Sequence, residues 1–207
     1  MENVLFYNIG NKPFTRLDLD EISFQLEQEN NIESGIYKYE YNLSKEKSSV
    51  LYREPCLNFC FEMNRLTSSL KPLEYWFAVK HGVINQISNR QIGKFHIVLL
   101  IECPTKYHNL ASLMKPMLDG IISAFHFETS PERKAIEYIA EQKHISELDV
   151  VKLLEESEYS LLGGRSLVSP FRNGIKWNPK DENCVGVNIR QVVYPRDNVK
   201  ILGKIIE

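Results

Sequence analysis

Hydrophobic residues follow two different periods within residues 94–127, and this stretch predicts the clearest elements of the chain. Over residues 95–102 the run is short, apolar and rich in β-branched side chains, which predicts a strand that is mostly buried on both faces. Pro104 ends this strand. Over residues 110–125 apolar side chains recur at spacings of three and four, which predicts an amphipathic helix.

The polar face of this predicted helix forms one narrow stripe, because residues advance by 100° along an α-helix. The stripe consists of His108, Ser112, Lys115, Asp119, Ser123 and His126. Such a stripe is either the solvated side of a core helix or the wall of a site. Pro116 lies inside the helix, where proline removes one hydrogen bond and costs roughly 3 kcal/mol, so we expect a kink there.

Alternating apolar positions predict further strands over residues 56–63, 185–193 and 199–206. Two more strands, 76–80 and 83–87, flank His81-Gly82, which suggests a hairpin turn. We expect 185–193 to join the main sheet, and 199–206 to close the chain or pair with a neighbour. The predicted fold class is α+β: a small, mostly antiparallel sheet of three or four strands covered by a long kinked helix, with two further short helices.

The two short helices are predicted within residues 131–158. Ser130 and Pro131 are typical of a helix start, and Ser146 with Asp149 forms a capping box. Their surfaces are acidic and would repel a phosphate backbone. We therefore expect this pair either to contact a protein partner or simply to cap the domain, rather than to read DNA.

Residues 1–49 are predicted to form an N-terminal appendage, with a strand over 4–9, a helix over 17–30 and a strand over 35–41. The polar run 42–49 is the best candidate boundary. Residues 50–207 then form the main domain.

Composition fits a globular protein of 207 residues with 43% hydrophobic residues and a net charge of −2. This charge argues against a uniformly basic nucleic-acid-binding surface, although residues 161–207 hold eight bases and four acids. The N-terminus lacks the pattern of a secretory signal, and the longest aliphatic run is too short to span a bilayer. We expect a cytoplasmic protein with no membrane contact.

The basic C-terminal segment holds candidate phosphate ligands. Gly163-Gly164 precedes Arg165, and Arg172, Lys176 and Trp177 follow in what we expect to be an irregular loop. Backbone amides beside cations suit a phosphate, and a tryptophan can stack on a base. The segment lacks the ending of a P-loop.

The stretch Ser-Leu-Met-Lys-Pro-Met-Leu-Asp-Gly-Ile, residues 112–121, resembles the helix of the RusA family of Holliday-junction resolvases, which reads D-x-D-N-L-x-K-P-x-L-D-A-L. The similarity covers about thirty residues, including the preceding strand. In that family acidic residues of this helix hold divalent metal at a dimeric active site, and the lysine assists catalysis. The resemblance implies a homodimer in which Lys115 and Asp119 belong to the site.

This chain departs from the family at the two earlier aspartates, which fall on Asn109 and Ala111. An amide and a methyl group do not replace the charged oxygens that Mg²⁺ prefers. Three interpretations stay open: a noncatalytic descendant, a site rebuilt with Glu102 and other acids, or a chance similarity.

Two functions follow from these patterns. The first is a noncatalytic or degenerate RusA-like protein that serves as an interaction subunit of a bacterial, phage or mobile-element assembly and binds nucleic acid. Its candidate contacts are Lys115, Arg165, Arg172, Lys176, Trp177 and Arg190. The alternative is a Mg²⁺-dependent endonuclease for branched or duplex DNA, with Asp119 and Glu102 as metal ligands and Lys115 stabilising the developing charge.

Overall fold

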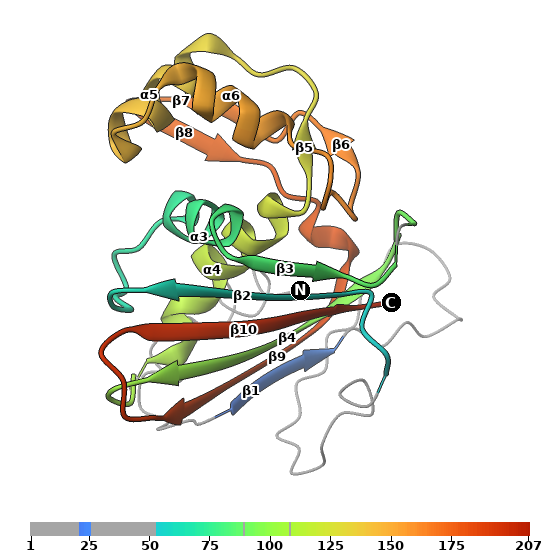
Figure 1. Cartoon of the computed structure of the whole chain (residues 1–207), viewed down its shortest axis with the longest axis vertical. Coiled ribbons are helices and arrows are strands. Elements are labelled where there is room, and N and C mark those ends of the chain that lie inside the picture. Colours follow the sequence, from blue (N-terminus) through green and yellow to red (C-terminus); the bar gives the residue numbers. More distant parts are fainter. Residues whose placement is uncertain (1–20, 26–52, 89, 108) are drawn as a thin grey trace, which may run out of the picture.

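A six-stranded sheet forms the main layer of the molecule in the computed structural model, which describes residues 21–25, 53–88, 90–107 and 109–207 (Figure 1). Its strands, in spatial order, are β1 (Glu21–Gln25), β9 (Cys184–Val193), β4 (Phe95–Cys103), β10 (Val199–Ile206), β2 (Leu57–Met63) and β3 (Val83–Gln86). Neighbouring strands are antiparallel except β4 and β9, which run parallel. The α+β class and the mostly antiparallel sheet are confirmed, but the sheet has more strands than predicted.

The two faces of β4 differ in burial. Phe95, Ile97, Leu99 and Ile101 are at most 1% exposed, whereas the residues between them are half-buried. Because side chains alternate across a strand, one face of the sheet is fully covered and the other only partly. The prediction of a strand is confirmed, and its burial is strongest on one face.

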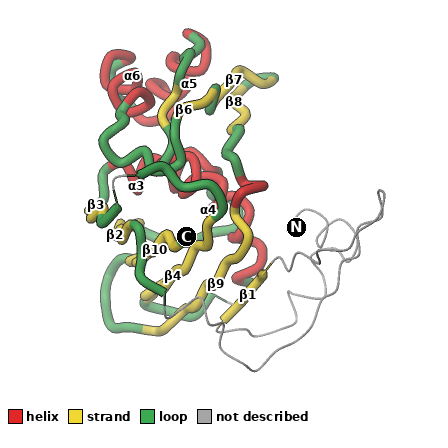
Figure 2. Tube along the Cα trace, turned by 90° about the vertical axis from the view of Figure 1, so that its right-hand side faces the viewer, coloured by secondary structure: helices red, strands yellow, loops and turns green. Residues whose placement is uncertain are grey.

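Helices α3 (Pro72–Lys80) and α4 (Leu110–Ala124) cover the buried face of the sheet (Figure 2). Asn109 caps α4 by accepting a hydrogen bond from the backbone N–H of Ser112 at 3.2 Å. The apolar side of α4 is fully buried, as the helical spacing predicts, and Pro116 lies within the continuous helix. The predicted helix over residues 110–125 is therefore confirmed.

The region 76–80 forms the end of α3, so the strand predicted there is wrong. Pro72 occupies the first turn, where its missing N–H has no intrahelical partner to lose. Leu73, Trp76 and Val79 are buried at a spacing of three. The aromatic residues favour a strand locally, but packing on α4 decides for a helix.

A second group of elements lies beyond α3 and α4 at one end of the molecule (Figure 1). It comprises the parallel pair β5 (Phe127–Glu128) and β6 (Gly164–Arg165), helices α5 (Arg133–Lys143) and α6 (Glu147–Glu155), and the hairpin of β7 (Val168–Phe171) and β8 (Gly174–Trp177). The two short helices are confirmed, and Ser146 caps α6 through the N–H of Asp149 at 3.1 Å. Helix α5 begins at Arg133, later than predicted.

The hairpin of β7 and β8 corrects the irregular loop expected around residues 170–177. Pro170 is tolerated because the hairpin has only two strands and therefore two free edges. Arg172 adopts a φ of 52° at the turn, a conformation that tight hairpin turns require.

Strand β1 corrects the helix predicted over residues 17–30. Glu21, Ser23 and Gln25 alternate with Ile22 and Phe24, and this period of two is that of a strand on the sheet edge. Its pairing with β9 means that this part of the predicted appendage belongs to the main sheet. The predicted strands 4–9 and 35–41 and the boundary 42–49 lie outside the described residues.

The last two strands are confirmed. β9 joins the main sheet as predicted, and β10 lies between β4 and β2 rather than at an edge. No helix in the described ranges has the length and apolar character needed to cross a membrane.

Candidate functional site

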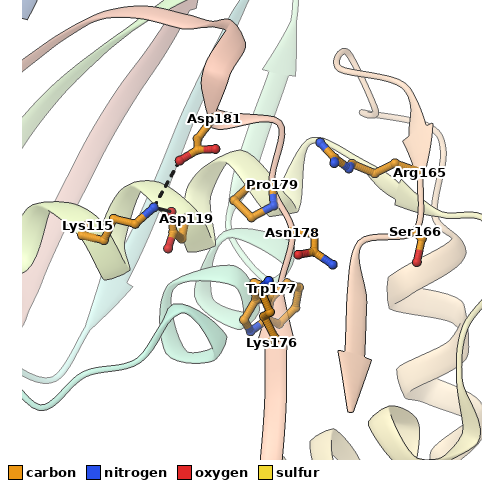
Figure 3. Close-up of a pocket in the computed structure, with 9 residues that line it drawn as sticks. All are labelled: Lys115, Asp119, Arg165, Ser166, Lys176, Trp177, Asn178, Pro179 and Asp181. Atoms are coloured by element: carbon orange, nitrogen blue, oxygen red, sulfur yellow. Dashed lines mark hydrogen bonds and ion pairs between the residues drawn. The ribbon is translucent and has the colours of Figure 1, made fainter. Parts of the chain in front are cut away.

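A pocket of about 370 Å³ lies where α4, β6 and the end of β8 meet (Figure 3). Its walls combine residues from distant parts of the chain, and three of the five charged ones are basic. The lining residues are Lys115, Asp119, Arg165, Ser166, Lys176, Trp177, Asn178, Pro179 and Asp181. The structure thus brings together five of the eight residues predicted for the site or its nucleic-acid contacts.

Lys115 and Asp119 form the α4 wall of this pocket. They lie one turn apart, and Lys115 Nζ donates to Asp119 Oδ1 at 2.7 Å. The same nitrogen donates to Asp181 Oδ2 at 3.1 Å. Asp181 begins the short 3₁₀ helix η2 (Asp181–Asn183), so the lysine joins two segments far apart in sequence.

Burial and charge shift the pKa values of this group in defined directions. Burial raises the pKa of Asp119 by more than the hydrogen bond and the charge of Lys115 lower it, and the nearby Asp181 carboxylate adds a smaller rise. Burial alone would lower the pKa of Lys115, but the two carboxylates raise it above its ordinary value. Lys115 therefore remains charged and paired at neutral pH.

Arg165 and Lys176 provide the other charges of the pocket. No hydrogen bond or ion pair joins either side chain to another residue of the described ranges. Arg165 Nε and Nη1 are shielded from solvent and have no acceptor, whereas Lys176 is exposed. Two positive charges thus face the pocket without a counter-ion from the described part of the protein.

Glu128 fixes the segment that follows Arg165. Its side chain is 2% exposed, and its two oxygens accept hydrogen bonds from the backbone N–H groups of Ser130, Leu167 and Val168 at 2.8–3.0 Å. Such charge-assisted bonds to backbone amides are strong. Arg165 and Ser166 are therefore held on a rigid support rather than on a free loop.

Trp177 is a wall of the pocket rather than an open stacking platform. It is 9% exposed, and its ring packs on Trp76 with the centroids 5.3 Å apart. Because most of the indole is covered, only a small part of it can meet a ligand. The expected stacking on a base has little ring surface available.

Three predicted site residues lie outside the pocket. Glu102 points to the sheet face opposite α4, where Arg196 donates to it at 2.7 Å. Arg190 is exposed, and it pairs with Leu100 of the neighbouring strand. Because paired residues point to the same face of a sheet, Arg190 also lies on the face opposite α4. Arg172 lies at the hairpin turn and stacks over Phe171 at 5.2 Å from the ring centroid.

The residues present do not fit the metal site that the RusA resemblance implies. Glu102 and Asp119 point to opposite sides of the sheet, and each carboxylate is paired with a cation of the protein. Between Asp119 and Asp181 the ammonium of Lys115 holds the position that a divalent ion would need. Within the described ranges no three His, Cys, Asp or Glu side chains gather as metal ligands would.

Sequence reasoning missed Ser166, Asn178 and Asp181 as pocket residues. Asp181 is 66 positions from Lys115, so no local spacing signals their contact. The far end of the predicted polar stripe also differs from a solvated face, since Ser123 is fully buried and His126 is 1% exposed. His126 Nδ1 donates to the carbonyl of Gly163 at 2.9 Å, which ties the segment just after α4 to the segment before Arg165.

Comparison of this chain with protein families, curated proteins and solved structures finds no match.

Proposed function

We propose that this protein is a noncatalytic nucleic-acid-binding subunit of RusA-like build, and that Arg165 and Lys176 of the pocket contact the phosphates. The observation that carries the proposal is the presence of two cations, Arg165 and Lys176, without counter-ions in the described structure. Phosphate neutralisation by Lys and Arg supplies most of the affinity of nonspecific nucleic-acid binding.

Binding is favoured over cleavage because of how the acids are arranged. Asp119 is paired with Lys115, and Glu102 belongs to an ion-pair network on the other face of the sheet. The groups that a metal-assisted attack would require are therefore not assembled in one place. The proposed role of Lys115 is to hold Asp119 and Asp181 and so to shape the pocket.

An assembly partner is the second part of the proposal. The acidic side chains of α5 and α6 are mostly exposed, as is Leu148, which is 63% exposed. Such a surface suits a basic protein partner better than a phosphate backbone. The homodimer, the cytoplasmic location, and nucleic-acid contacts by Arg172 and Arg190 stay predictions.

Fluorescence anisotropy tests the binding proposal. Labelled junction, duplex and single-stranded DNA are titrated with the full chain at two salt concentrations. We expect binding at low salt, and a loss of roughly tenfold or more in Arg165→Gln/Lys176→Gln. Removing two phosphate contacts should also reduce the salt slope by about 1.4–1.8.

The matched control is Lys134→Gln/Lys204→Gln, which removes the same charge at two exposed positions outside the pocket. Its affinity should stay within about twofold of the unchanged chain. An absence of binding at low salt, or an equal loss in the control, contradicts the proposal.

A further inference from the structure

The two sides of the pocket carry opposite charges, and this arrangement restricts the ligands that it can bind. Figure 3 shows Arg165 and Ser166 on one side and Asp119 and Asp181 on the other, with residues 176–179 between them. A negative group is stabilised at the first side, and hydroxyl or amino donors are stabilised at the carboxylates. A ligand that fits both sides carries an anion at one end and hydrogen-bond donors at the other.

The size of the pocket favours a small ligand or the end of a long one. A volume of about 370 Å³ lies near the lower limit of small-molecule sites, which is roughly 300 Å³. A continuous strand in a duplex presents each phosphate between two sugars on a convex surface. A terminal phosphate has only one sugar attached and can enter a concave site more deeply.

The environment of Arg165 favours a group of high charge. Two of its three nitrogens are shielded from solvent and lack acceptors, which leaves Nη2 as the nitrogen able to meet a ligand. A guanidinium in such surroundings is weakly hydrated, so an anion beside it gains more energy than at an open surface. Lys176 adds a second positive charge. A phosphate monoester carries about −1.5 to −2 at neutral pH and matches this pair better than a diester with a single charge.

We infer that the pocket binds the phosphate monoester of one nucleotide, with the phosphate at Arg165 and Lys176 and the sugar or base toward Asp119 and Asp181. The source of this group is either a free mononucleotide or the phosphorylated end of a strand. This inference rests on the proposed function and specifies the ligand of the same site.

Isothermal titration calorimetry of the full chain tests the inference with matched probes. Three single strands of one sequence carry a 5′-phosphate, a 3′-phosphate or no terminal phosphate, and adenosine monophosphate is compared with adenosine. We expect at least tenfold tighter binding of one phosphorylated strand than of the unphosphorylated strand, or of the mononucleotide than of the nucleoside. The preference should weaken below about pH 6, where the monoester dianion takes up a proton and becomes a monoanion.

Two single variants test whether the preference for a terminal phosphate arises in this pocket. Lys176→Gln is one of them, because its exposed side chain can be replaced without disturbing the core. Arg165→Gln and Lys176→Gln should each reduce the preference at least threefold, and Lys134→Gln/Lys204→Gln should keep it. A preference that survives both pocket variants overturns the assignment of the site.

The remaining outcomes separate this inference from the proposed function. Equal binding of all three strands, with no preference for the mononucleotide over the nucleoside, overturns the inference and leaves nucleic-acid binding intact. An absence of binding by every probe overturns the inference, and it overturns the proposed function as well when junction and duplex DNA also fail to bind in the anisotropy titrations. Binding of the mononucleotide without any preference among the strands identifies a free nucleotide as the source, whereas a preference confined to strands identifies a strand end.

Discussion

Lys115 is the counter-ion of both carboxylates in the pocket. Its ammonium donates to Asp119 and to Asp181, and the Asp119 side chain is only 16% exposed. A carboxylate in this setting is costly to leave without a cation. The lysine that the family resemblance marks as catalytic thus has a structural task visible in its contacts.

Replacing Lys115 with methionine should lower the free energy of unfolding by about 1–2 kcal/mol, because two carboxylates lose their charged donor. Adding Asp119→Asn should recover part of this loss, since a neutral amide does not need the cation. Urea denaturation of both variants measures the effect. A double variant less stable than Lys115→Met contradicts this account.

His126 is a buried titratable residue next to the pocket. Burial lowers its pKa to about 4, and the positive charges of Arg165 and Lys180 act in the same direction. The ordinary value of 6.5 applies in the unfolded chain. Between these two values the unfolded state binds a proton that the folded state does not, so stability decreases as the pH falls through this window.

The expected decrease between pH 6.5 and pH 4 is at most about 3 kcal/mol from His126. In His126→Asn the amide can still donate to Gly163, but this part of the pH dependence should disappear. Urea midpoints measured at pH 7 and pH 5 for both proteins provide the test. Identical pH dependence in the two proteins would show that another group is responsible.

At the scale of elements, helices α3 and α4 pack closely against each other because a glycine lies where they cross. A Cβ at Gly120 would lie 2.4 Å from the carbonyl oxygen of Pro72 and 2.7 Å from Tyr75 Cβ. Backbone atoms of α3 cannot yield as a flexible side chain can. Residue 120 is therefore held as glycine by the approach of a second helix.

Gly120→Ala should destabilise the protein by about 1–3 kcal/mol through overpacking, although alanine is the better helix former by about 1 kcal/mol. Gly93→Ala is the matched control, because nothing lies within 4 Å of its added Cβ. The control should be neutral or slightly stabilising. Thermal unfolding of the two variants tests the prediction, and a stabilised Gly120→Ala contradicts it.

At the scale of the whole molecule, two ion pairs join α3 to the second group of elements. Lys80 donates to Glu156 at 3.0 Å, and Lys143 of α5 pairs with Glu74. The Lys80 side chain is 2% exposed, and burial lowers its pKa despite the carboxylate. These pairs hold α5 and α6 against the layer that carries Lys115, so they maintain the geometry of the pocket.

Glu156→Gln should lower the free energy of unfolding by about 2 kcal/mol, because the buried Lys80 loses its counter-ion. Arg133→Gln breaks an exposed pair with Glu137 and should leave the free energy of unfolding nearly unchanged, because an exposed ion pair contributes little. Urea denaturation of both variants makes the comparison. An equal effect of the two substitutions contradicts the structural role of Lys80.

Local patterns in the sequence determined the elements whose burial is one-sided. The period of two in β4 and the spacing of three and four in α4 identify both, because each buries one face against the same core. The same spacing placed Lys115 and Asp119 on one side of a helix, which is half of the pocket. In α3 local propensity and tertiary contacts disagree, and the tertiary contacts decided the structure.

Tertiary structure alone decided the rest of the site. Arg165 and Asp181 reach α4 from segments far along the chain, and only the folding of β5, β6 and β8 onto the helices sets their distances. It also separated Glu102 and Arg190 from the pocket, since whether a strand residue faces the helices depends on the register of the sheet. Residue types and spacing along the chain carry no measure of these long-range distances, whereas packing of the two layers fixes them.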